Sequence, residues 1–392
     1  MVLVITFQVR LVDCEPEVNR SRTLYVPYMS VKQKGNSDNE SANASMSVRT
    51  GRECFRALSM PEAVTLASCV YRVRASVPSR SKATADMVQT DEAFWTIFSF
   101  HFLSGEAFTK ADCDAGLTRA VLDATTARRL FGTTDAVGHT VQLDYVDYTV
   151  AGVVADVSML ATAAYAQIWV PYTAAGAEAM SWQNDTMGPM HAIILARSSA
   201  DFDAIREETE LLRKKYNDGL QDVEVFYRGQ PDTQLAYLYR RWYAEPDVPG
   251  VMLRYAIVVI ILLLVPAVNL SGMTLSRMRR RMAEIGVRKA FGATGGELMR
   301  QVFFENLVLT LLAGIVGLAL SYVATFALNG FLFSNSMNAS LSGETALTPG
   351  MLLSPWAFIA AFAFCLLMNI LSAGIPAWRA SRMNITDAIN QR

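Results

Sequence analysis

The sequence predicts a membrane protein in which an α-helical transmembrane bundle of three complete spans carries a large α+β extracytoplasmic domain. Three observations predict it: long uncharged apolar runs in the last third, a dense basic segment between two of these runs, and opposite net charges in the two parts of the chain. The 392 residues are 52% hydrophobic and the mean hydropathy is positive, which is typical of membrane proteins.

Three apolar runs are long enough to cross a bilayer, which takes about 20 residues. They are Tyr255–Met273, Leu307–Leu328 and Trp356–Ile375. The loop between the second and third runs holds no Lys or Arg and is therefore expected outside, whereas the tail with Arg379, Arg382 and Arg392 is expected inside. We place transmembrane helices at 251–275, 303–330 and 355–376, the outer loop at 331–354 and the cytoplasmic tail at 377–392.

The segment Ser276–Arg300 contains seven Lys or Arg residues and is therefore expected on the cytoplasmic side. Met278, Met282 and Ile285 recur near a helical period among these cations, which predicts a surface helix that Gly292 interrupts. Such a helix could lie on the membrane interface or dock into a groove of a partner protein. The alternative is an ordinary basic loop that only sets the topology.

Residues 10–250 are expected to form the soluble domain. Of the 35 Lys+Arg and 36 Asp+Glu residues, 11 and 5 lie after residue 250, which leaves 24 and 31 before it. An acidic domain is thus joined to a basic membrane module, and neither part resembles a nucleic-acid-binding surface. Strands are predicted at Thr23–Met29, Val70–Val77, Thr118–Leu122, Tyr148–Val154, Ile168–Val170 and Ala192–Ala196, and helices at Asp91–Phe100, Ala124–Phe131 and Phe202–Tyr216.

Two further segments of the domain have distinctive composition. Gln33–Ser47 is polar, lacks core-forming residues and is predicted to be a mobile loop. Gln230–Glu245 has a helical pattern with Tyr237, Tyr239 and Trp242 near its end. These aromatic residues either mark the membrane interface or pack against the soluble domain.

Catalytic and metal-binding motifs are missing from the sequence. It contains no GxxxxGK[ST] phosphate loop, no HExxH and no GxSxG motif, so we expect no catalytic site, no metal site and no cofactor site in this chain. The five cysteines form no CxxC pair. A disulfide among Cys14, Cys54, Cys69 and Cys113 is one alternative, and buried thiols that act as small hydrophobic side chains are the other.

The order of residues in the basic segment resembles a known family. The run EIGVRKAFGA at residues 284–293 resembles the hallmark cytoplasmic segment of MacB-like (FtsX-like) ABC transporter permeases, and the resemblance extends from Asn269 to Asn306. In that family the segment is a coupling helix that rests on a separate ATPase subunit. The resemblance implies an ATPase-docking role for Glu284, Ile285, Gly286, Val287, Arg288, Lys289, Gly292 and Ala293.

The resemblance covers nearly the whole chain. Asp91–Trp95, Ala127–Gly132 and Val150–Asp156 are similar to parts of the MacB-type periplasmic core domain, and the tail is similar to the family's closing motif. Family members begin with a full transmembrane helix. Met1–Val9 is too short to span a bilayer and resembles the end of that first helix, so we expect that this span is truncated or missing, through a misassigned start, a truncation or a real variant.

The family likeness implies a permease subunit in the inner membrane that transmits ATP-driven motion to a periplasmic domain, for export or extraction of a peptide, drug or lipoprotein. ATP and Mg would bind to the partner ATPase. Expected partners are that ATPase, a second permease in a homodimer or heterodimer, membrane lipid and a periplasmic adaptor, with no nucleic acid. The alternatives are a membrane-anchored sensory or structural protein without an ATPase, or a truncated, non-functional permease.

Small residues recur every four positions along the second predicted span. The stripe allows close helix approach, either between two copies of the chain or with another span of the same chain. Its members are Ala313, Gly317, Ser321 and Thr325.

Overall fold

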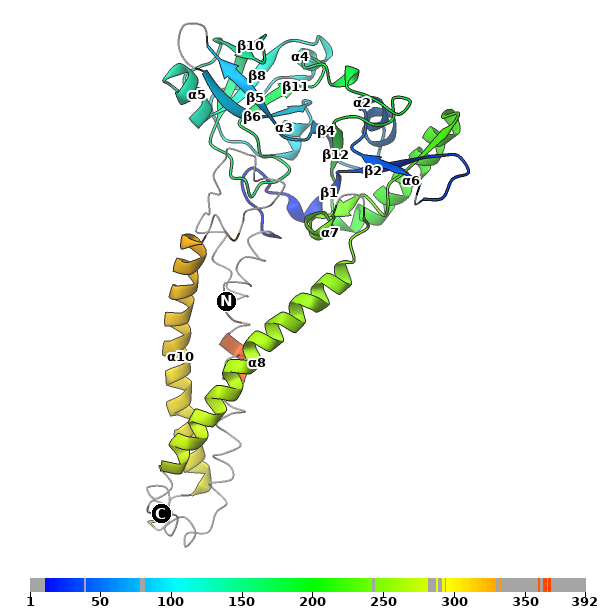
Figure 1. Ribbon diagram of the computed structural model, residues 1–392. Helices are drawn as coiled ribbons and strands as arrows, with labels where there is room; N and C mark the ends of the chain where they lie inside the picture. The colour runs from blue at the N-terminus through cyan, green and yellow to red at the C-terminus, as the bar shows by residue number, and fades with distance from the viewer. Residues whose placement is uncertain are drawn as a thin grey trace. The chain divides into compact units, whose positions relative to one another are not determined.

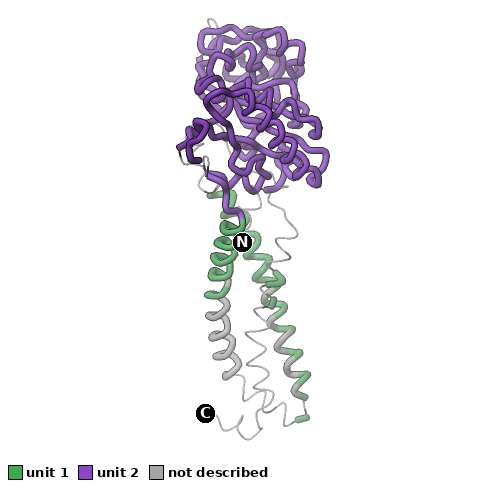
Figure 2. The backbone as a smooth tube through the Cα atoms, turned by 90° about the vertical axis from the view of Figure 1, so that its right-hand side faces the viewer, with its two compact units in different colours: residues 1–8, 249–328, 352–392 green, residues 9–248, 329–351 purple. Residues whose placement is uncertain are grey.

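The computed structural model describes residues 11–328 except 39, 78–81, 242–243, 281–286, 288–290 and 293, together with residues 332, 359, 362–364 and 366–367. The described chain falls into two compact units, coloured separately in Figure 2. One unit is built on the residues up to Val248 and is called the domain below. The other is built on the helices that follow Pro249 and is called the helical unit (Figure 1).

A seven-stranded mixed sheet in the order β7-β10-β8-β11-β6-β5-β9 organises one lobe of the domain. Strands β8 and β10 pair in parallel, as do β6 and β11, and the other pairs are antiparallel. Strand β9 pairs with both β5 and β10, which closes the ladder on itself. We call this the seven-stranded lobe. Its elements are β5 Tyr71–Ser76, β6 Lys82–Thr90, α3 Phe94–Ile97, β7 Phe102–Gly105, α4 Lys110–Asp114, β8 Arg119–Asp123, α5 Ala124–Phe131, β9 Thr140–Leu143, β10 Val146–Val154 and β11 Ile168–Pro171.

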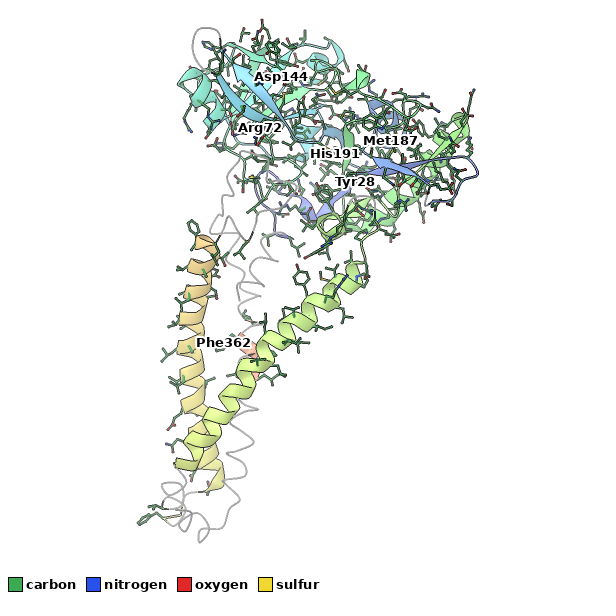
Figure 3. The ribbon with its side chains drawn as sticks, in the orientation of Figure 1. Tyr28, Arg72, Asp144, Met187, His191 and Phe362 are labelled. Atoms are coloured by element: carbon green, nitrogen blue, oxygen red, sulfur yellow. The ribbon has the colours of Figure 1, made fainter. Side chains whose placement is uncertain are left out.

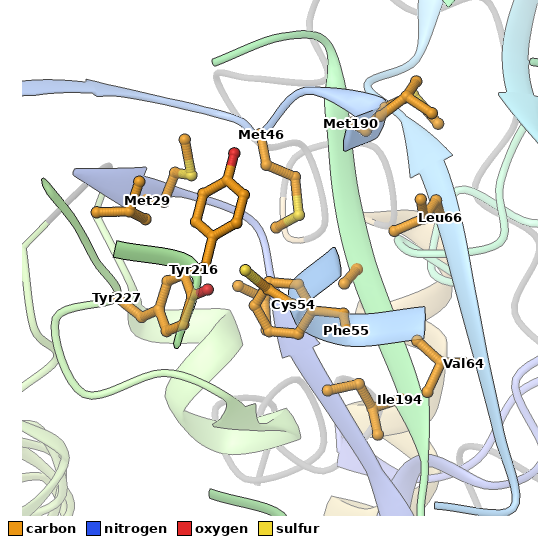
Figure 4. Packing of buried hydrophobic residues seen from close by; sticks show 14 of the residues in the cluster. Met29, Met46, Cys54, Phe55, Val64, Leu66, Met190, Ile194, Tyr216 and Tyr227 are labelled. Atoms are coloured by element: carbon orange, nitrogen blue, oxygen red, sulfur yellow. The ribbon is translucent and has the colours of Figure 1, made fainter. Parts of the chain in front are cut away.

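A four-stranded sheet in the order β14-β1-β12-β4 and a three-stranded sheet in the order β13-β2-β3 form the other lobe, the four-stranded lobe. Its buried cluster contains Met29, Met46, Phe55 and Tyr227, shown in Figure 4. Figure 3 labels Tyr28, Met187 and His191 in this lobe and Arg72 and Asp144 in the other. Its elements are η1 Arg20–Arg22, β1 Thr23–Val26, β2 Met29–Gln33, β3 Ala42–Ala44, α2 Val48–Gly51, the π-helical η2 Arg52–Arg56, β4 Ala63–Ser68, η3 Ala177–Ala179, β12 Met190–Leu195, η4 Ser199–Asp201, α6 Phe202–Gly219, β13 Val223–Phe226, β14 Asp232–Thr233 and α7 Gln234–Tyr239.

Several predicted elements are confirmed, and α5 shows why. Asp123 caps its first turn by accepting a hydrogen bond from the Thr126 N–H, and Gly132 ends it with a left-handed φ of +79°. Both signals are local and therefore readable from sequence. The predicted strands at β5, β8, β10, β11 and β12 and the helix at α6 are confirmed as well.

The prediction that Gln33–Ser47 is a loop without core residues is wrong in its second half. Ala42–Ala44 forms β3 and pairs with β2, and Met46 is fully buried. Met46 also exchanges backbone hydrogen bonds with Met190 of β12. Met190 lies far away in the sequence and the residues around β3 are polar, so the local composition concealed both the strand and the buried Met46.

The predicted helix Asp91–Phe100 is also wrong, because only Phe94–Ile97 is helical. The aromatic residues of this segment form a core: Trp95 makes ring contacts with Phe100, Phe108 and Trp169 at centroid distances of 4.9, 5.3 and 6.2 Å. The strand predicted at Thr23–Met29 is divided, since β1 ends at Val26 and β2 begins at Met29. Aromatic packing, rather than helix periodicity, decides the first of these segments.

The helical unit contains two long helices, α8 (Val248–Arg280) and α10 (Gly295–Ala327). Within the described residues, one helix, Leu307–Ala327, is long and apolar enough to cross a membrane, and Val248–Leu262 is a shorter apolar helix. Most of the third predicted span lies outside the described residues. The count of three spans therefore stays a prediction.

Candidate functional site

The predicted docking segment lies between α8 and α10. Of its eight residues, Val287 and Gly292 are described, whereas Glu284, Ile285, Gly286, Arg288, Lys289 and Ala293 lie outside the described residues. The ends of the predicted coupling helix, residues 276–280 and 295–300, belong to α8 and α10. Any separate helix in this segment is therefore shorter than Ser276–Arg300.

Phe291 and Gly292 form a turn shortly before α10. The Phe291 N–H donates to the Val287 carbonyl at 3.1 Å, and Gly292 follows with a φ of +96°. Thr294 and Glu297 then form a capping box: the Thr294 hydroxyl accepts from the Glu297 N–H, and the Glu297 carboxylate accepts from the Thr294 N–H. The first turn of α10 is thus fixed immediately after the docking motif.

Phe291 is a candidate docking residue that the sequence reasoning did not select. Its side chain is 89% exposed, and Val287, one helical turn earlier, is half exposed. Large aromatic side chains of this kind often supply binding energy at interfaces when they enter a pocket on a partner. An aromatic residue inside an otherwise basic run was the signal that could have identified it.

The four residues of the small-residue stripe differ in exposure along α10. Ala313 is exposed, Gly317 and Ser321 are half-buried, and Thr325 is buried. The Thr325 hydroxyl donates to the Ser321 carbonyl at 2.8 Å, and the Ser321 hydroxyl donates to the Gly317 carbonyl at 2.7 Å. Beside the stripe, a Cβ atom at Gly314 would lie 3.5 Å from the Phe362 ring. Gly314 is not a member of the stripe, so the packing partner of the stripe itself stays a prediction.

Cysteine chemistry contributes no site in the described chain. Cys14, Cys54, Cys69 and Cys113 are free thiols, so the suggested disulfide is not formed. Burial raises the pKa of the Cys54 and Cys14 thiols to about 12, which keeps them protonated and unreactive. Among the described residues, no three His, Cys, Asp or Glu side chains are grouped as metal ligands.

A buried carboxylate joins the two lobes of the domain. Asp91 directly follows β6 of the seven-stranded lobe and accepts hydrogen bonds from the Thr65 hydroxyl at 2.6 Å and the Leu66 N–H at 3.1 Å, both on β4. Arg56 lies 3.6 Å from Asp91 and donates to the Val64 carbonyl at 2.6 Å. These contacts fix the end of β6 against β4, so Asp91 controls how the lobes meet.

Asp91 gives the domain a testable pH dependence. Burial raises the pKa of its carboxyl from 3.8 to about 6, although Arg56 acts in the opposite direction. Because the pKa is higher in the folded state, the associated stabilisation is complete below pH 3.8 and is lost as the pH rises through about 6. Between pH 4 and 7 the melting temperature should therefore fall more steeply for the unmodified chain than for Asp91→Asn. Thermal unfolding across that range measures this, and equal slopes would contradict it.

The described residues define a class of architecture: an α+β domain followed by long helices, one of which is long and apolar enough to cross a membrane. Residues 17–212 match the model of the MacB-like periplasmic core domain, and residues 256–385 match that of the FtsX-like permease C-terminal region. The chain belongs to the MacB-like, FtsX-like family of ABC transporter permeases. Proteins of this family are inner-membrane proteins with a periplasmic domain.

The macrolide export ATP-binding/permease protein MacB of Chromobacterium violaceum is 25% identical over 307 residues, which is 78% of this chain and 43% of that protein. The protein of that name in Escherichia coli K12 is 26% identical over 314 residues, with the same coverage. The crystal structure of the periplasmic region of MacB from Actinobacillus actinomycetemcomitans is 18% identical, with a TM-score of 0.37, over 52% of this chain and 90% of that one. The chain spans less than half the length of these curated relatives.

Proposed function

We propose that this chain is the permease subunit of an ABC transporter, in which a separate ATPase subunit moves the segment between α8 and α10 and this motion reaches the periplasmic domain. The observation that supports the proposal is that a match to the MacB-like periplasmic core domain and a match to the FtsX-like permease region occur in one chain. ATP and Mg would then bind to the partner.

The covalent arrangement supports this coupling. The docking segment continues directly into α10, and α8 runs from Val248 at the end of the domain to Arg280 at the start of the segment. A displacement of the segment can therefore act on the domain through α8. A dimer, contact with lipid and a periplasmic adaptor would complete the complex, and the transported substrate would be a peptide, drug or lipoprotein.

Reversing the charge of Arg288 tests the docking. Loss of a cation from an interfacial charge pair costs about 2–5 kcal/mol, so Arg288→Asp should reduce co-purified ATPase at least about tenfold. Phe291→Ala should also weaken docking, because it removes the exposed ring. Tagged full-length chain is purified from its own cells, and a co-purified protein counts only if sequencing finds GxxxxGK[ST] in it.

Arg300→Asp is the matched control for this experiment. It makes the same charge change on the exposed surface of α10, seven positions beyond the end of the docking motif, and should leave the amount of ATPase unchanged. Equal recovery with Arg288→Asp and Arg300→Asp would refute docking through residues 284–293. Recovery of a histidine kinase or another regulator in place of an ATPase would favour the sensory alternative.

A further inference from the structure

A short loop of the seven-stranded lobe receives buried contacts from the start of the domain. This loop, Ser158–Tyr165, connects β10 to β11. The Glu17 carboxylate accepts hydrogen bonds from its Ala163 N–H at 2.7 Å and its Ala164 N–H at 3.0 Å. The Arg20 guanidinium donates to its Leu160 carbonyl. The segment that leads into β1 is therefore attached to the seven-stranded lobe through hydrogen bonds from charged side chains.

Glu17 and Arg20 also bond to each other, with 2.7 Å between the Arg20 Nε and the Glu17 Oε2. Both side chains are 1% exposed, and the guanidinium donates further to the Val12 carbonyl at 2.6 Å. A buried ion pair is held in place only when its remaining donors and acceptors are satisfied, and here backbone groups of the loop and of Val12 bond to them. Each side chain matches one kind of backbone group of the loop: the Glu17 carboxylate faces N–H groups, and the Arg20 guanidinium faces a carbonyl group.

The segment from β14 to α8 is connected to the same loop through β1. Asp232 and Thr233 of β14 pair with Tyr25 and Leu24 of β1, and the Tyr237 ring of α7 stacks on Tyr25 with 4.5 Å between centroids. Arg240, eight residues before α8, forms a buried ion pair with Asp232. The contacts thus run from Arg240 to β14, from β14 to β1, and from β1 through η1 to Arg20 and the loop. The predicted aromatic segment Gln230–Glu245 therefore packs against the domain at Tyr237, whereas Trp242 lies outside the described residues.

We propose that loop Ser158–Tyr165, held by Glu17 and Arg20, is a junction that transmits motion to the seven-stranded lobe. The motion would come from the segment that leads into β1 and from the segment that connects β14 to α8. Glu17 and Arg20 are positioning residues in this role. This inference rests on the proposed function, because it names the place where transmitted motion passes from one lobe to the other.

The test uses the full-length chain in lipid nanodiscs with its co-purified ATPase, and compares hydrogen exchange without nucleotide and with ATP plus vanadate. Unmodified chain should show nucleotide-dependent exchange at residues 158–165 and in the strands β10 and β11. Glu17→Met/Arg20→Met replaces both charges with apolar side chains of similar length, which removes the loop contacts without leaving one charge of the pair buried alone. In this variant, nucleotide-dependent exchange should be lost in the seven-stranded lobe and kept in β1 and α7.

Glu210→Met/Arg213→Met is the matched control. It removes another ion pair, at 2.7 Å on α6, whose further contact is to Val225 within the four-stranded lobe, and it should leave the exchange response intact. If the Glu17→Met/Arg20→Met variant does not fold, Arg20→Lys provides a milder change. Lysine keeps a cation beside Glu17 but cannot donate to Glu17, Val12 and Leu160 with the same geometry, so a reduced response is expected.

The outcomes separate the two proposals. An intact response at residues 158–165 in the folded Glu17→Met/Arg20→Met variant, or in Arg20→Lys when that is the variant that folds, would overturn the junction and leave the proposed function standing. Absence of any nucleotide-dependent change in the domain of the unmodified chain, despite ATP hydrolysis by the bound partner, would overturn the proposed function itself.

Discussion

Replacing Arg240 by alanine is expected to lower the free energy of unfolding of the domain by about 3–5 kcal/mol, because it leaves the Asp232 carboxylate buried without its cation. The two side chains are 1% and 3% exposed, and the guanidinium also donates to the Arg228 and Ala244 carbonyls, each at 3.0 Å. Urea titration of the detergent-solubilised chain, followed by tryptophan fluorescence, measures the change.

Arg49→Ala is the control for this prediction. Arg49 forms an ion pair with Glu53 at 2.9 Å, but the two side chains are 48% and 50% exposed, and such pairs contribute at most about 1 kcal/mol. The comparison therefore contrasts a buried, multiply bonded arginine with an exposed one, since residue type and substitution are the same. Similar small losses for Arg49→Ala and Arg240→Ala would show that the Asp232 pair is solvated in solution.

The predictions that succeeded depend on local signals. Asp123 and Gly132 define the two ends of α5, and the alternating apolar residues of β10 define a strand, so neighbouring residues alone suffice. Gly292 is another local signal. A glycine at the end of a helical pattern predicts a turn, and Gly292 has a φ of +96°.

The elements that were missed depend on distant partners. Strand β6 contains Asp86, Gln89 and Thr90, polar residues that are nonetheless buried. Their polar atoms bond to Tyr165, Tyr71 and Leu66, respectively. A buried polar residue costs free energy unless a partner satisfies it, and that partner cannot be read from the strand itself.

The same reasoning explains why the junction could not be predicted. Charged side chains such as Glu17 and Arg20 are expected on the surface when only their neighbours are known. Their burial depends on backbone groups of the loop Ser158–Tyr165, some 140 residues further along the chain. The position of such a pair becomes visible only when the fold brings the loop to it.

Replacing Gly105 by alanine should be among the most destabilising single changes in the seven-stranded lobe. Gly105 faces Gly152 across the β7–β10 ladder, and a Cβ atom at Gly105 would lie 2.2 Å from the Ala151 carbonyl oxygen and 2.9 Å from the Gly152 Cα. These are backbone atoms, so relief requires the strands to move apart. With overpacking and the left-handed φ of +66° together, we expect a loss of about 3 kcal/mol or more.

Gly116→Ala separates the two causes of this loss. Gly116 has nearly the same backbone conformation, with a φ of +62°, but nothing lies within 4 Å of its added Cβ. Its substitution should cost only the conformational part, about 1–2 kcal/mol. Urea titration of both variants measures the difference, which reports how closely β7 and β10 approach. If the two variants lose equal stability, the close approach at Gly105 contributes nothing, and backbone conformation alone explains the glycine.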